Sequence, residues 1–269
     1  GRLEKRTVLS FCHYMEIKEN ASLQVRKASF FKLPCIDEHV KVVVNGDKGK
    51  ITLNTTYRYN RANNMRNYFK QTNKKELIDG WNRFLFYNLN YVNDRSEQDI
   101  REIFKDASIR IENDNKEENE LTIAYEATII KPYFTNKEGR EFLMYFDHSV
   151  LKKDLIDFRH KDSSYWHNYD SEHYIIELYA DKPIDTKEKY TIQELDISND
   201  YFTYTSKKTI DKTSGKVEIS YNPLTNIEIT LDKIQELKDN YNRIGDSNFG
   251  LGIDILPKGI LSKIRSWFS

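Results

Sequence analysis

Cysteine, glycine and proline are all scarce in this chain of 269 residues, with two, ten and five copies respectively. The cysteines, Cys12 and Cys35, can form at most one disulfide and therefore no disulfide framework, and neither belongs to a CxxC motif. They leave open both the redox compartment and whether they pair with each other. So little glycine and proline disfavours long disordered linkers and low-complexity tracts.

The chain also lacks long apolar runs and an excess of charge of either sign. No run of about 18 apolar residues occurs, so we predict no transmembrane helix. Residues 1–6 are charged and contain no apolar core, so we predict no signal peptide, and we expect the chain to be part of a longer polypeptide. Lysine plus arginine equals aspartate plus glutamate at 42 each, which argues against a nucleic-acid binder, because such a protein needs a basic surface.

Aromatic and β-branched residues are abundant, and many of them follow the period of a β-strand. The chain has 18 tyrosines and 14 phenylalanines, which suit half-buried sheet surfaces. In the second half, strands are predicted over 173–179, 201–205 and 216–221. Residues 211–215 supply a turn, and a helix is predicted over 231–244, where apolar residues recur at spacings of three and four. Thr230 or Asp232 is a suitable N-cap for this helix.

The first half contains the clearest hairpin of the chain. Two runs rich in β-branched residues, 39–44 and 50–59, flank Asn45-Gly46, and this dipeptide is typical of tight hairpin turns. Residues 63–91 are helical in composition, and residues 96–104 carry a helix start signature. Further strands are predicted over 107–112, 120–130 and 140–150.

These patterns together predict a mainly β fold with some helix, arranged as two antiparallel β-sandwich-like domains with one or two packed helices each. The first domain would span residues 1–155, with a helical insertion at about 63–105. The second and smaller domain would span residues 156–269 and carry the helix at about 231–244. The boundary is set where the strand pattern is lost, between residues 152 and 171.

The segment 159–173 is the richest polar and aromatic stretch, and it offers two kinds of candidate site. Tyr165, Trp166 and Tyr169 could form a flat stacking surface for a sugar or a peptide. Metal-ligand residue types also occur there, namely His160, Asp162, His167, Asp170, Glu172 and His173. Their spacing matches no tetrahedral zinc pattern, so no metal or other cofactor is predicted. The plainer interpretation is an ordered interdomain loop whose aromatic side chains pack at the junction.

Three other features have both a functional and a structural interpretation. Cys12 or Cys35 could serve as the nucleophile of a cysteine hydrolase, but a lone cysteine is usually a small buried apolar residue. Asp196, Asn199 and Asp200 could bind calcium, but they lack the ligand ladder of an EF-hand loop, so a solvated turn is expected. The amphipathic tail from Ile260 to Phe268 could touch a membrane surface or could pack on the second domain.

The order of the elements resembles a known architecture. A hairpin with a glycine-containing turn (45–59) precedes a helical segment with Arg66 and Phe69, and the strand sequence Leu-Thr-Ile-Ala-Tyr follows at 121–125. The strands at 174–178, 201–204 and 215–220 and the helix from Leu231 complete the series. Over residues 40–245 this order resembles the non-catalytic β-sandwich region of bacterial transglutaminase-like proteins of the domain-of-unknown-function type.

The resemblance implies that the chemistry lies outside this chain. In that family a Cys-His-Asp triad stands upstream of the sandwich region, and no residue of this chain matches it. The resemblance therefore implies a non-catalytic binding or scaffolding module, more an accessory part than an enzyme, with the upstream catalytic domain or a protein or glycan ligand as its partner. It also implies an exported, cell-envelope location in a bacterium. The alternatives from the residues themselves are the cysteine hydrolase and the sugar- or peptide-binding module.

Overall fold

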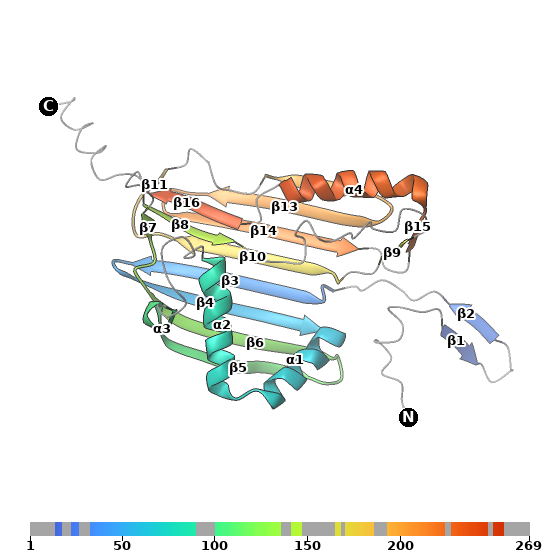
Figure 1. Ribbon diagram of the computed structural model, residues 1–269, viewed down its shortest axis with the longest axis horizontal. Helices are drawn as coiled ribbons and strands as arrows, with labels where there is room; N and C mark the ends of the chain where they lie inside the picture. The colour runs from blue at the N-terminus through green and yellow to red at the C-terminus, as the bar shows by residue number, and fades with distance from the viewer. Residues whose placement is uncertain are drawn as a thin grey trace.

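A computed structural model describes residues 14–17, 23–26, 33–89, 100–135, 141–146, 165–167, 170–185, 193–223, 227–246 and 250–255 of the chain. The strands in these ranges are β1 (Tyr14–Ile17), β2 (Leu23–Arg26), β3 (Ile36–Asn45), β4 (Lys48–Arg58), β5 (Phe104–Asn115), β6 (Glu120–Ile130), β7 (Phe134–Thr135), β8 (Glu141–Phe146), β9 (Tyr165–His167), β10 (Glu172–Tyr179), β11 (Ile184–Asp185), β12 (Leu195–Ser198), β13 (Phe202–Ile210), β14 (Ser214–Pro223), β15 (Ile227–Ile229) and β16 (Gly250–Ile255). The helices are α1 (Asn60–Gln71), α2 (Lys74–Asn88), α3 (Ile100–Ile103) and α4 (Leu231–Asp246). The predicted mainly β fold with some helix is confirmed (Figure 1).

An eight-stranded sheet dominates the molecule, in the order β12-β13-β14-β10-β3-β4-β6-β5. Its neighbouring strands are antiparallel except for the central pair, because β10 runs parallel to β3. The predicted boundary at 155/156 lies outside the described residues, and strands from both sides of it join through this parallel pair. The strands of both predicted domains therefore share one sheet and one continuous core.

The predicted hairpin and the last helix lie where the sequence placed them. β3 and β4 pair from Ile36↔Tyr57 to Asn45↔Lys48, and Gly46 adopts the positive φ of 65° that the tight turn needs. Helix α4 covers the predicted 231–244 and extends it to Asp246. Of the predicted 96–104 helix, the structure describes residues 100–104; α3 covers Ile100–Ile103, and β5 begins at Phe104.

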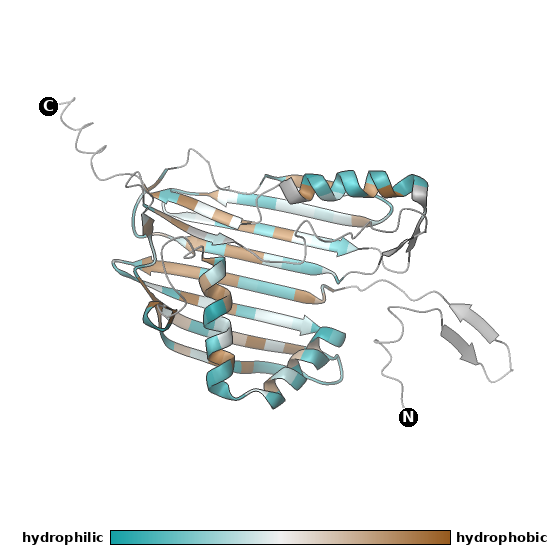
Figure 2. Ribbon diagram, viewed as in Figure 1, coloured by the Kyte–Doolittle hydropathy of each residue, from teal (hydrophilic) through white to brown (hydrophobic). Residues whose placement is uncertain are grey.

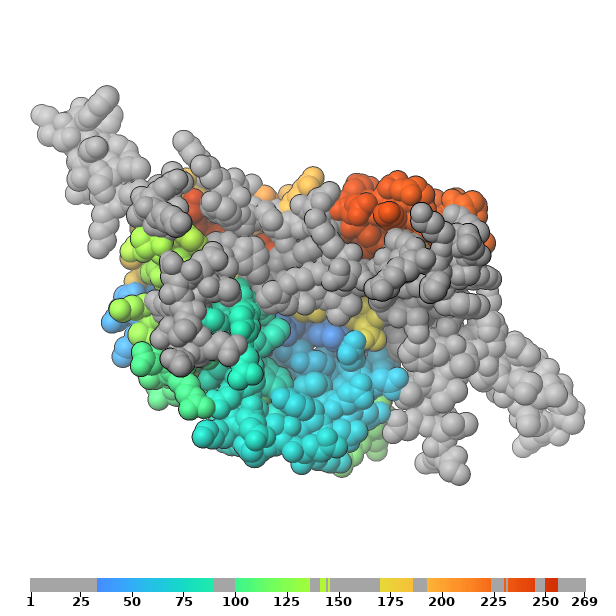
Figure 3. Space-filling view, in the orientation of Figure 1, coloured from blue at the N-terminus to red at the C-terminus, as the bar shows by residue number. Residues whose placement is uncertain are grey.

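One face of the large sheet is covered by helices and by a second sheet (Figures 1 and 3). Helices α1 and α2 lie over the half formed by β3, β4, β6 and β5, while α4 lies along β13. The four-stranded sheet β11-β16-β8-β7 lies over β10 and β14. Gly215 permits this close approach, since a Cβ there would stand 3.1–3.3 Å from side-chain atoms of Leu251 and Ile253.

Alternation along each strand explains which face is covered (Figure 2). In β3 the even-numbered residues Val40, Val42 and Val44 are buried under the helices, while the odd-numbered residues point to the opposite face. The covered face is therefore called the core face, and the other is called the open face. In the described ranges, no helix is long and apolar enough to cross a membrane.

Candidate functional site

A cavity of about 430 Å³ opens between the core face and helices α1 and α2. β3 and β4 supply its base, and the two helices supply its walls. Its lining residues are Glu38, Leu53, Tyr57, Met65, Tyr68, Gly80, Trp81 and Phe84. We call this space the Glu38 cavity, because Glu38 is the acidic residue among these described lining residues.

Glu38 occupies a position where the strand pattern calls for an apolar residue. It shares the core face with Val40 and Val42, and only 6% of its surface is exposed. Thr55, directly opposite on β4, donates its hydroxyl to Glu38 Oε2 at 3.0 Å. Burial raises the pKa of the Glu38 carboxyl from 4.5 to about 7, although the Thr55 hydrogen bond lowers it. Glu38 is therefore poised between its neutral and charged forms at physiological pH.

The walls of the Glu38 cavity are aromatic and are exposed at the mouth. The Tyr68 and Trp81 ring centroids lie 6.3 Å apart, and Phe69 packs edge-on against Trp81 at 6.0 Å. Tyr68 and Phe84 are 41% and 39% exposed, which is unusual for residues of their size within a core layer. These two side chains mark the opening to solvent.

Polar contacts hold both helices in place over the sheet. Arg66 of α1 donates to Asp114 Oδ1 at 2.7 Å, to Asn119 Oδ1 at 2.6 Å and to the Glu120 carbonyl at 2.9 Å. On α2, the buried Asn82 side chain accepts a hydrogen bond from the Tyr125 hydroxyl of β6. The helix positions are thus fixed by the fold, so the cavity is preformed.

A second buried carboxyl stands beside the first. Glu172 begins β10, is 1% exposed, and accepts a hydrogen bond from the Tyr174 hydroxyl at 3.0 Å. Tyr174 is the direct neighbour of Glu38 across the parallel pair, so the two carboxyls are diagonal neighbours on the core face. Burial, together with the charges of Asp170 and Glu38, raises the pKa of Glu172 to about 7, although the Tyr174 hydrogen bond and the charge of Arg61 lower it. Within the described ranges, Glu172 Oε1 has no hydrogen-bond partner.

The residues that precede β3 and β10 are tied together at the end of the sheet. Arg61 of α1 pairs with Asp170 at 2.5 Å, and the Cys35 N–H donates to the Ser171 carbonyl at 2.7 Å. Cys35 itself is 1% exposed, and burial, followed by the charge of Asp170, raises the pKa of its thiol to about 11. The thiol is therefore protonated at neutral pH, whereas a nucleophilic cysteine needs a lowered pKa.

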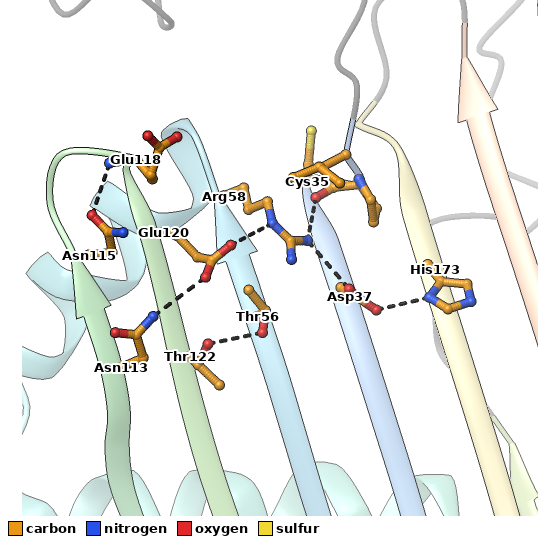
Figure 4. Close-up of polar contacts among 12 residues, drawn as sticks. Cys35, Asp37, Thr56, Arg58, Asn113, Asn115, Glu118, Glu120, Thr122 and His173 are labelled. Atoms are coloured by element: carbon orange, nitrogen blue, oxygen red, sulfur yellow. Dashed lines mark hydrogen bonds and ion pairs between the residues drawn. The ribbon is translucent and has the colours of Figure 1, made fainter.

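The open face carries a chain of paired polar groups that crosses five strands (Figure 4). His173 Nδ1 lies 2.9 Å from Asp37 Oδ1, and Arg58 contacts the other Asp37 oxygen at 3.5 Å. Arg58 also donates to Glu120 Oε2 at 2.8 Å. The Asp37 hydrogen bond raises the pKa of His173, and the same contact lowers the pKa of Asp37. These charges are satisfied by one another.

The structure separates the metal-ligand residue types suggested by the sequence. His173 points to the open face and binds Asp37, whereas Glu172 lies on the core face and Asp170 pairs with Arg61. No group of three potential metal ligands occurs within the described part of the chain. The positions of His160 and Asp162 lie outside it, and so does the side chain of His167.

The structure describes the other predicted sites only in part. Tyr165 and Trp166 lie on β9, which pairs with β15, but their side chains and all of Tyr169 lie outside the described residues. Cys12 and the tail from Ile260 to Phe268 lie outside them as well. Asn199 Oδ1 accepts from the N–H groups of Tyr201 and Phe202, so this side chain closes a turn.

Sequence reasoning missed Glu38 and named Glu172 only as a metal-ligand residue type, although a signal for a buried carboxyl was present at both positions. The apolar alternation of β3 places position 38 on the face of Val40 and Val42, and the alternation of β10 places position 172 on the face of Ile176. A carboxylate in an apolar register is costly unless it has a role or a partner, so it marks a candidate site. No local signal revealed the aromatic walls, because they arise only when α1 and α2 dock.

Comparisons of the chain with models of protein families, with curated proteins and with solved structures find no match. The candidate site therefore stands on its own geometry.

Proposed function

We propose that this chain is a non-catalytic binding module that takes a small organic ligand in the Glu38 cavity. The main observation that supports this proposal is the combination of aromatic walls with a buried acidic group at the base of the cavity. Small-molecule sites are concave, mostly apolar spaces of roughly 300–1,000 Å³ with few polar groups, and the cavity of about 430 Å³ fits this description. The binding role agrees with the function expected from the sequence, but it uses a different site.

Gly80 supports a cavity that is kept open. It lies within helix α2, where glycine costs about 1 kcal/mol relative to alanine. It lines the cavity, and a Cβ at this position would stand 3.5 Å from the Tyr68 hydroxyl, which is ordinary contact. An alanine would therefore fit and would stabilise the helix, whereas a larger side chain would enter the cavity. Glycine therefore makes helix α2 less stable than alanine would, at a position where a larger side chain would reduce the space for a ligand.

The cysteine hydrolase receives no support from Cys35, because burial keeps its thiol protonated. A carboxyl with a pKa near 7, such as Glu38, is also suited to general acid or base catalysis. A test of binding must therefore check that each bound compound is recovered unchanged.

The test is a ligand-detected NMR screen with small aromatic compounds, comparing three proteins. Wild type and the matched control G80A should bind the same compounds, because a methyl group at position 80 meets only ordinary contacts. G80L should lose at least tenfold in affinity, since its side chain fills the space beside Trp81 and Phe84. Unfolding curves verify that G80L is folded. Equal binding by folded G80L and wild type would contradict the proposed site.

The wider setting stays a prediction from the sequence resemblance. In it, this binding module is the accessory part of a transglutaminase-like, exported bacterial protein, with a catalytic domain upstream as its partner. Sugar or peptide binding by Tyr165, Trp166 and Tyr169 likewise stays a prediction. The intact mass of the protein in its source cells would tell whether a further domain precedes residue 1.

A further inference from the structure

We infer that the ligand of the Glu38 cavity is an organic cation, an arylalkyl- or alkyl-ammonium whose charged group contacts Glu38 and whose apolar part lies among the aromatic walls. This inference rests on the proposed function and specifies its ligand class. It follows from the missing partner of one carboxyl, from the chemistry of the walls and from the distribution of charge around the site.

The first observation is that Glu38 has no cation beside it. Within the described ranges, its interaction partner is the Thr55 hydroxyl, and no ion pair includes it. The neighbouring guanidinium of Arg61 is already paired with Asp170 at 2.5 Å. A buried carboxylate is stable only when it is paired and hydrogen-bonded, so the charged form of Glu38 requires a cation that the described residues do not supply.

The second observation is that the walls suit a cation as well as an apolar body. The indole of Trp81 and the phenol rings of Tyr57 and Tyr68 line the same space as Glu38. Aromatic faces attract ammonium groups, with tryptophan the strongest, and rings around a carboxylate recognise amines in this way. Phe84 and Leu53 add apolar surface for the rest of the ligand. A negatively charged ligand would meet Glu38 and the negative faces of these rings.

The titratable groups around Glu38 decide how binding depends on pH. From each packed element these are Glu172 on β10, Tyr57 on β4, and Arg61 and Tyr68 on α1, while the lining residues of α2 carry no charge. The hydroxyl of Tyr57 has a pKa raised by burial and by Glu38, so it stays neutral across the relevant range. Glu172 is neutral or negative; its negative form attracts a nearby ammonium, and its neutral form does not oppose one.

A proton must leave Glu38 when the cation binds. The free carboxyl is protonated in part at neutral pH, and the ammonium pairs with its ionised form, so one proton passes to the solvent for each ligand bound at low pH. The affinity for a permanently charged ligand should therefore fall as the pH drops through 7. A neutral ligand of the same shape should show no such dependence, or should bind better at low pH.

The experiment is titration calorimetry with matched pairs of compounds that differ in one group, for example 2-phenylethylammonium and 2-phenylethanol, with benzyl and indolylethyl pairs beside them. At pH 8 we expect the ammonium compound to bind at least tenfold more tightly than the alcohol. At pH 6 we expect its affinity to be about tenfold lower than at pH 8, because each pH unit below the pKa reduces the ionised fraction tenfold. The alcohol should change less than twofold.

The variant E38Q separates charge from shape. Glutamine keeps an oxygen that can accept from Thr55, so the base of the cavity is preserved and only the charge is lost. E38Q should bind the ammonium and the alcohol with closely similar affinity, and the pH dependence that remains for the ammonium should be smaller than in wild type and should come from Glu172. The control E126Q, which removes an exposed carboxyl on the open face, should bind both compounds like wild type.

Each outcome has a definite meaning. Equal binding of ammonium and alcohol by wild type in every pair, with binding abolished by G80L, overturns the inference and leaves the proposed function intact. If no compound of either kind binds to wild type, both the inference and the proposed function are overturned.

Discussion

The two faces of the large sheet give adjacent titratable residues opposite environments. Asp37 on β3 and His173 on β10 lie on the open face, whereas their neighbours Glu38 and Glu172 lie on the core face. On the open face, Asp37 and His173 lie 2.9 Å apart, and each stabilises the charge of the other. On the core face, Glu38 and Glu172 are buried, and the pKa of each is raised to about 7. Between residues one position apart, the open face thus favours the charged forms and the core face favours the neutral forms.

The comparison shows that the face of the sheet, and not the residue type, sets the chemistry. The open-face pair is half exposed, and its ionised form contributes stability between the lowered pKa of Asp37 and the raised pKa of His173. Among the described residues, no ion pair includes either core-face carboxyl, and the hydrogen bonds from Thr55 and Tyr174 do not outweigh the effect of burial. A fold that keeps two uncompensated acids in its core loses stability there, and this is expected of a functional site.

The largest expected effect concerns the pH dependence of stability. The folded-state pKa values of Glu38 and Glu172 are raised from 4.5 to about 7, so the native state binds more protons than the unfolded state in this window. Stability should therefore fall as the pH rises from 4.5 to 7. At about 1.4 kcal/mol per pKa unit, the loss is on the order of 3 kcal/mol for each carboxyl. Urea unfolding at pH 5, 6, 7 and 8 measures it.

Variants assign this loss to the core face. E38Q and E172Q should each flatten the curve and should be more stable than wild type at pH 8. The control E126Q removes an exposed carboxyl whose pKa is lowered by Lys50, so the slope between pH 5 and 8 should not change. A wild-type stability that is constant over this range would contradict the raised pKa values.

Local features of the fold were predictable from the sequence, and the overall assembly was not. The Asn45-Gly46 turn and the alternation around it fix the β3–β4 hairpin, because a hairpin is specified by neighbouring residues. The parallel pairing of β3 with β10 joins residues more than a hundred positions apart, such as Glu38 and Tyr174. No local pattern encodes that contact, so the sequence did not reveal that strands of both predicted domains join in one sheet.

The candidate site likewise has one part that was predictable from the sequence and one part that was not. Glu38 could have been found by extending the alternation of β3 by one step toward its beginning, since a charge then falls on the face of Val40. The walls depend on tertiary contacts of α1 and α2, including the Arg66 contacts with the β5–β6 end and the Asn82 hydrogen bond. Sequence periodicity gives the apolar stripe of a helix but not the gap that remains where Gly80 lies.

An intermediate effect is expected on the open face. Because Asp37 is the main cause of the raised pKa of His173, D37N should lower that pKa. The matched control is E218Q, whose carboxyl lies farther from the ring, at 3.5 Å from Nε2 against 2.9 Å for Asp37. E218Q should therefore lower the pKa less. NMR titration of the His173 ring measures both changes, and an equal or larger change in E218Q would contradict the assigned pairing.

The smallest expected effect on stability concerns threonine hydrogen bonds on the two faces of the sheet. Thr56 and Thr122 share a hydrogen bond of 3.0 Å on the open face, whereas Thr55, one residue away, supports a buried carboxyl. A double-mutant cycle of T56V and T122V should give a coupling of about 0.5 kcal/mol, typical of cross-strand pairs that water can replace. T55V removes the hydroxyl that lowers the Glu38 pKa, so its cost should grow as the pH rises. The Thr56–Thr122 coupling should be the same at pH 5 and 8, because neither partner titrates. Equal pH dependence for the two faces would remove the distinction between them.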